Sequence, residues 1–117
     1  MDRKQLERLV AAAIPRGIAD ESLLARVRKS KINTHPASRT NLLRIYTRRM
    51  KCTRGDPVLL KLTEELVHFL ESHPTDELLM IDVDGQDGYY TFLLADHETL
   101  EILHWMRMFG AGNTTPK

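Results

Sequence analysis

Apolar residues recur at three- and four-residue spacing in four stretches of the first 74 residues, the spacing that places them on one face of a helix. Each stretch follows a residue whose side chain commonly caps a helix N-terminus. These capping residues are Asp2, Asp20, Ser38 and Asp56. The predicted helices therefore span roughly 3–14, 21–28, 38–52 and 57–73. The segment 29–36 has no periodic pattern and is predicted to be a loop.

Two later apolar runs, Leu78–Val83 and Tyr89–Ala95, are predicted to be the strands of one hairpin, joined by the turn-rich residues 84–88. Asp96 then caps a predicted C-terminal helix that ends at Gly110. The pattern predicts an α+β fold in which four helices, a hairpin and a last helix form one domain over residues 1–110. The polar residues 111–117 are predicted to be a disordered tail.

Length and cysteine content narrow the class of protein. A chain of 117 residues is long enough to bury a core without disulfides or a structural metal. Cys52 is the single cysteine, which excludes an intrachain disulfide and favours a reducing compartment. The first residues lack the apolar core of a signal peptide, and no apolar run approaches the ~20 residues that span a bilayer. The sequence therefore predicts a cytoplasmic protein that makes no membrane contact.

The net charge of +1 hides a strong segregation of charge along the chain. Residues 26–61 hold eleven basic residues and one acidic residue, Asp56. Residues 62–106 hold eleven acidic residues and no Lys or Arg. Such segregation produces strong surface potentials and indicates binding partners of complementary charge.

The basic residues of the third predicted helix share one surface. Leu42, Leu43, Tyr46 and Met50 fall on one face of residues 38–52, and Asn41, Arg44, Arg48 and Lys51 fall opposite. Arg and Lys one turn apart suit phosphates, and Asn and Arg suit adenine and guanine edges. The predicted loop at 29–36 is too long for a helix-turn-helix motif. The alternative explanation is a solvated face, or one neutralised by the acidic half of the chain.

The acidic half is open to a second interpretation, as a docking surface for a protein with a basic surface. Trp105 lies at the rim of the apolar stripe of the predicted last helix, beside Glu98 and Glu101, where an aromatic residue often anchors an interface. Asp84 and Asp87 in the hairpin loop extend this surface. Acidic faces that serve only solubility are equally common.

The remaining candidates for chemistry have simpler explanations. Asp82, Asp84 and Asp87 cluster near one turn but do not match the twelve-residue calcium loop. His97 and His104 are too far apart on a helix to share one ion with Glu101. Cys52 lies among basic residues that favour its thiolate, but no base is paired with it in the sequence. We therefore expect no catalytic activity, no metal and no cofactor.

The leading hypothesis is a small non-catalytic regulatory protein, of an inhibitor or immunity type, that binds another protein through charge-complementary contacts. The alternative is a nucleic-acid-binding regulator that uses the basic helix 38–52. A third alternative is a homodimer in which the positive patch of each copy meets the negative patch of the other.

Overall fold

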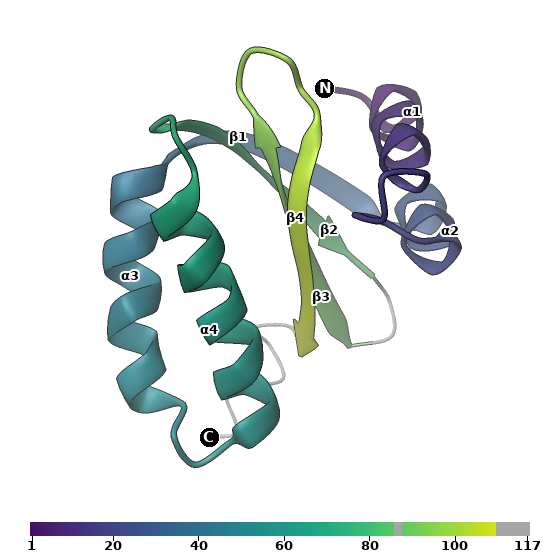
Figure 1. Ribbon diagram of the computed structural model, residues 1–117. Helices are drawn as coiled ribbons and strands as arrows, with labels where there is room; N and C mark the ends of the chain where they lie inside the picture. The colour runs from purple at the N-terminus through teal and green to yellow at the C-terminus, as the bar shows by residue number, and fades with distance from the viewer. Residues whose placement is uncertain (86–87, 110–117) are drawn as a thin grey trace. The chain divides into compact units, whose positions relative to one another are not determined.

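The computed structural model describes residues 1–85 and 88–109 (Figure 1). Within these residues the chain forms four helices and one four-stranded sheet, so the fold is α+β. In chain order the elements are α1 (Arg3–Ala13), α2 (Glu21–Lys29), β1 (Lys31–Ser38), α3 (Arg39–Cys52), α4 (Pro57–Ser72), β2 (Glu77–Asp84), β3 (Tyr89–Asp96) and β4 (Ile102–Phe109). The predicted tail 111–117 lies outside the described residues. Contacts divide the chain into two compact units, one of residues 36–78 and one of the residues on either side of that segment.

In the unit that contains the chain's N-terminus, α1 and α2 pack together and cover one face of the sheet with apolar side chains. Leu6 and Val10 of α1 and Val27 of α2 are fully buried, as are Ile81 of β2 and Leu93 of β3. Both helices begin where the sequence predicts. The carboxylate of Asp2 accepts the main-chain N–H of Gln5, and the carboxylate of Asp20 accepts that of Leu23, each at 2.8 Å.

The sheet is antiparallel, with its strands in the order β1-β2-β3-β4. The two predicted strands are present as β2 and β3, and they lie side by side in the sheet. The prediction of a single hairpin is wrong, because β1 and β4 pair on either side of them.

The predicted C-terminal helix is a strand. Asp96 does accept the N–H groups of Glu98 and Thr99, at 2.8 and 2.9 Å, as a helix cap would. At Leu100, however, the chain adopts a left-handed conformation with φ of 64°, and it reverses direction into β4. A capping side chain stabilises a helix start and a tight turn equally, so Asp96 alone could not distinguish them.

The spacing of apolar residues in β4 imitates that of a helix. A register irregularity between Leu94 and Ala95 pairs Leu94 with His104 but Ala95 with Ile102. Ile102 and Trp105, three residues apart, consequently both pack toward the core beneath α1 and α2. In a regular strand, residues three apart lie on opposite faces. The predicted helical stripe was Ile102, Leu103, Met106 and Phe109. In β4, Ile102 and Met106 are both buried but only Ile102 belongs to this core, so apolar residues on both faces of a strand imitated a helical stripe.

The prediction of a loop at 29–36 is also wrong, because most of this segment belongs to β1. Lys31 and Asn33 are exposed, whereas Ile32 and Thr34 are half-buried, which is the alternation of a strand. The loop was predicted because the segment lacks a long periodic pattern, and Pro36 interrupts the alternation. The strand is at the edge of the sheet, where a residue without an N–H is tolerated.

The unit of residues 36–78 contains α3 and α4, which pack side by side (Figure 1). The predictions of both helices are confirmed. Ser38 caps α3, and the Asp56 carboxylate accepts the N–H of Leu59 at 3.1 Å, with Pro57 in the first turn of α4. None of the described helices is long and apolar enough to cross a membrane.

Candidate nucleic-acid interface

Helix α3 carries five basic residues and no acidic residue. The basic residues are Arg39, Arg44, Arg48, Arg49 and Lys51. Leu42 and Tyr46 are buried, so the opposite side of the helix is the accessible one. The hydroxyl of Ser38 accepts the main-chain N–H of Asn41 at 3.3 Å and fixes the start of the helix.

A carboxylate distant in sequence also holds the start of α3. Asp76 accepts the main-chain N–H of Thr40 at 2.8 Å, the hydroxyl of Thr40 at 2.6 Å and the hydroxyl of Ser38 at 2.8 Å. Its own main-chain carbonyl accepts the N–H of Arg39 at 2.8 Å. The hydrogen bonds from Thr40, then that from Ser38, and finally the charge of Arg39 lower the pKa of Asp76 below its usual value. Two segments 36 residues apart are thus joined at the base of the helix.

Two of the five cations of α3 have structural roles. The Arg39 guanidinium donates to the main-chain carbonyl of Leu70 at 3.0 Å and so satisfies a carbonyl in the last turn of α4. The Arg49 guanidinium stacks over the Tyr46 ring, 5.1 Å from its centroid. The remaining cations are Arg44, Arg48 and Lys51, which are all exposed.

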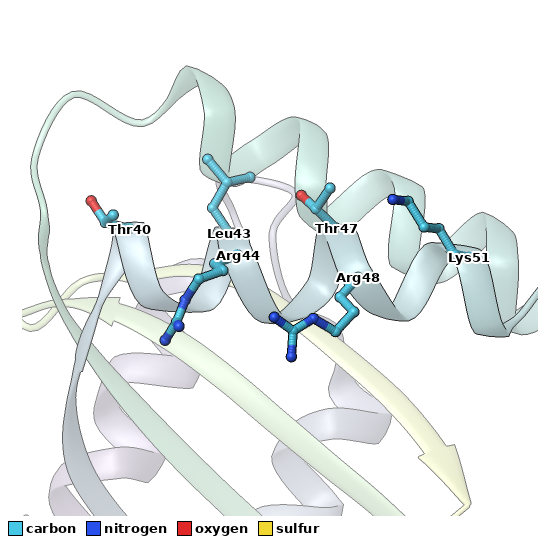
Figure 2. Close-up of a pocket in the computed structure, with 6 residues that line it drawn as sticks. All are labelled: Thr40, Leu43, Arg44, Thr47, Arg48 and Lys51. Atoms are coloured by element: carbon cyan, nitrogen blue, oxygen red, sulfur yellow. The ribbon is translucent and has the colours of Figure 1, made fainter.

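These three cations line an open groove of about 460 Å³ along α3 (Figure 2). Arg44 and Arg48 project to the same side of the helix, and Lys51 follows one turn further on. The hydroxyls of Thr40 and Thr47 lie on the same stretch of helix as the cations. Cationic and hydroxyl donors on one surface are the groups that proteins use to bind phosphate oxygens.

A second hollow of about 240 Å³ continues the groove toward the start of α4. Thr47 and Lys51 line both hollows, so the two are contiguous. Arg54 adds a fourth cation at this end, and Glu64 adds a carboxylate. The cationic surface therefore extends past the C-terminus of α3.

Arg44, Arg48 and Lys51 are not neutralised within the described residues. Of the carboxylates in the described part of the chain, none forms an ion pair with Arg44, Arg48 or Lys51. Arg44 donates to the side-chain oxygen of Asn41 at 3.4 Å, which leaves its charge uncompensated. The full positive charge is available to a ligand.

The residues predicted to form an acidic docking surface do not share a helix. Trp105 is in β4, where it packs half-buried against the core, and its indole N–H donates to the main-chain carbonyl of Ile18 at 2.8 Å. Glu101 forms an ion pair with Arg16 at 3.5 Å, and Glu98 is exposed in the turn between β3 and β4. Asp84 is exposed at the end of β2. Asp87 lies outside the described residues.

The other residues considered for chemistry are also placed by the structure. Asp82 accepts the hydroxyl of Tyr90 and lies 3.8 Å from a ring nitrogen of His35, across three neighbouring strands. Within the described residues, no group of three or more His, Cys, Asp or Glu side chains is arranged to hold a metal ion. Cys52 is exposed at the end of α3.

Comparisons with protein-family models, with curated proteins and with solved structures give no match for this chain.

Of the four residues predicted from the sequence, Arg44, Arg48 and Lys51 line the groove, whereas Asn41 is linked to it through its hydrogen bond with Arg44. Thr40 and Thr47 lie one turn from the cations, at helical positions that the same periodicity would have grouped with them. The clamp by Asp76 and the contribution of Arg54 depend on how the chain folds back. No local pattern indicates either.

Proposed function

We propose that this protein is a non-catalytic nucleic-acid-binding protein, and that the cationic groove of α3 binds the phosphate backbone. The observation that carries the proposal is a set of exposed cations, Arg44, Arg48 and Lys51, on an acid-free helix. None of them has an ionic partner in the part of the chain that the structure describes. Each cation that neutralises a phosphate releases a condensed counterion, which is the main source of affinity for nucleic acid.

The spacing of the cations suits a phosphate chain. At a rise of 1.5 Å per residue, Arg44 and Lys51 lie about 10 Å apart along the helix axis. Three steps of a nucleic-acid strand cover about the same length, at 3.4 Å per step. Arg48 lies between them, and the hydroxyls of Thr40 and Thr47 supply further donors along the same line.

Two other occupants have weaker support. A partner protein with a basic surface would dock on the acidic residues between β3 and β4, Glu98 and Glu101. The predicted anchor Trp105, however, donates its indole N–H within its own chain. A second copy of the chain would pair the basic face with an acidic face. We favour nucleic acid because the cations and hydroxyls that would bind phosphate lie on one continuous surface.

The test is titration of a labelled duplex with the full chain, followed by fluorescence anisotropy at several salt concentrations between about 50 and 200 mM. The key variant combines Arg44→Glu, Arg48→Glu and Lys51→Glu. A matched control combines Lys4→Glu, Arg8→Glu and Lys29→Glu, which change the net charge equally at exposed positions of α1 and α2. Circular dichroism verifies that both variants are folded.

We expect the wild type to bind with a strong salt dependence and the control to retain most of its affinity. The α3 variant should lose binding, and single substitutions should each lower the slope of log affinity against log salt by about 0.9. Absence of wild-type binding at about 50 mM salt would overturn the proposal. So would an equal loss in the control, since net charge alone would then explain the binding.

A further inference from the structure

Helix α3 exposes an apolar side chain among its cations. Ile45 is 41% exposed, next to Arg44 in sequence and one turn beyond Asn41. Phosphate binding gives no role to an aliphatic side chain at this position. Val58 of α4 is more exposed still, so exposure alone assigns no role; Ile45 is distinguished by its place among the cations of α3.

The exposed residues of α3 form a central stripe with a cation on each side. At 100° per residue, Asn41, Ile45 and Arg48 fall within an arc of about 60°. Arg44 and Lys51 border this arc on one side, and Arg49 borders it on the other. Leu42 and Tyr46, on the far side of the helix, are buried.

We propose, on the basis of the function proposed above, that α3 enters the major groove of duplex DNA and reads base edges through Asn41, Ile45 and Arg48. An α-helix of about 10–12 Å diameter fits the major groove, which is about 12 Å wide. Arg44 and Lys51 then face the phosphates at one side of the groove. Arg48, which binds phosphate in non-specific complexes, contacts a base edge at the preferred site. The narrow major groove of an RNA duplex would exclude the same helix.

The three side chains of the stripe match the chemistry of three different bases. An Asn side chain pairs with the N6 and N7 atoms of adenine, an Arg side chain pairs with the O6 and N7 atoms of guanine, and an apolar side chain contacts the thymine methyl group. Asn41 and Arg48 lie about 10 Å apart along the axis, the length of three base-pair steps. The stripe is therefore suited to a site of three or four base pairs.

Asn41 is partly organised for this role before DNA binds. Its side-chain oxygen accepts the Arg44 guanidinium at 3.4 Å, which orients the amide. The oxygen keeps a second lone pair, and the amide nitrogen keeps its donors, so both groups that adenine requires are available.

The experiment is selection of duplexes from a random-sequence library with the full chain, followed by sequencing of the bound fraction. The variants are Ile45→Ser and Asn41→Ala, neither of which changes the charge. Val58→Ser is the matched control, because Val58 is 71% exposed on α4 and lies outside the stripe. Salt titrations on one fixed duplex run in parallel.

We expect the wild type to enrich one short motif with roughly 5- to 150-fold discrimination at each contacted base pair. Ile45→Ser should remove the preference at one thymine position and Asn41→Ala that at one adenine position, with the salt slope unchanged. Val58→Ser should select the wild-type motif. Salt-dependent binding without any enriched motif, or a motif unaltered by both stripe variants, would overturn this inference and leave the proposed function standing. A complete lack of duplex binding would overturn both.

Discussion

Trp105 offers the sharpest test of how the C-terminal part of the described chain is built. Its indole N–H donates to the carbonyl of Ile18, 87 residues away, and its ring packs half-buried against the core beneath α1 and α2. A fully buried Trp removes about 150–250 Å² from water. Truncation of this half-buried ring to Ala should therefore expose on the order of 100 Å², or about 2.5 kcal/mol.

The hydrogen bond adds to this loss. Loss of this hydrogen bond leaves the Ile18 carbonyl without its donor, which lowers the free energy of unfolding by about 1 kcal/mol. Trp105→Ala should thus lower the free energy of unfolding by about 3 kcal/mol. Trp105→Phe keeps most of the ring contact and loses the donor, so it should lose about 1 kcal/mol. The comparison of the two variants separates packing from hydrogen bonding.

The assay is urea unfolding followed by circular dichroism, since Trp105 is the only tryptophan and its fluorescence is lost in both variants. Ile45→Ala provides a control, an apolar truncation at an exposed position, and should change the free energy of unfolding by less than about 0.5 kcal/mol. If Trp105→Ala were as mild as this control, the packing assigned to Trp105 would be refuted. A Trp105→Phe variant as stable as the wild type would show that the hydrogen bond to Ile18 does not contribute to stability.

Three further predictions concern α3. Arg39→Gln should lower the free energy of unfolding by about 1 kcal/mol, because the Leu70 carbonyl loses its donor, and it should leave the salt slope of duplex binding unchanged in titration. The lowered pKa of Asp76 contributes stability that is present above its unfolded value of 3.8 and is lost as the pH falls through the folded value. Asp76→Asn should therefore lower the stability at pH 7 and weaken its dependence on pH, as measured by urea unfolding between about pH 2 and 6. Cys52 should react with a maleimide in the folded protein, and saturating duplex should slow that reaction, as measured by mass spectrometry; an unchanged rate would contradict the orientation proposed for α3.

Features of this fold that depend on neighbouring residues were predictable from the sequence. Asp2, Asp20, Ser38 and Asp56 each accept an N–H three residues ahead, and this interaction is encoded within a single turn. The cations of α3 were predictable for the same reason, since helical spacing alone groups Arg44, Arg48 and Lys51.

Features that depend on distant pairing were not predictable. β4 has a local pattern that suits a helix, and it becomes a strand because the main-chain groups of β3 need partners along its free side. β1 has only four residues of clear alternation before Pro36, too few to outweigh a proline without knowledge that the strand is at the edge.

The same distinction governs how the charge of this chain should be interpreted. The eleven basic residues between positions 26 and 61 suggest one broad cationic surface, yet several of them are used within the fold. Arg26 donates to the main-chain carbonyl of Tyr89, Arg28 pairs with Glu7, and Arg39 and Arg49 have the roles described above. The partners of Arg26, Arg28 and Arg39 are each more than 20 residues distant in sequence. Composition could therefore not reveal these three contacts. Within the described residues, the cations of α3 that have neither an ion pair nor such a structural contact are Arg44, Arg48 and Lys51, and the proposed binding surface is built on these three.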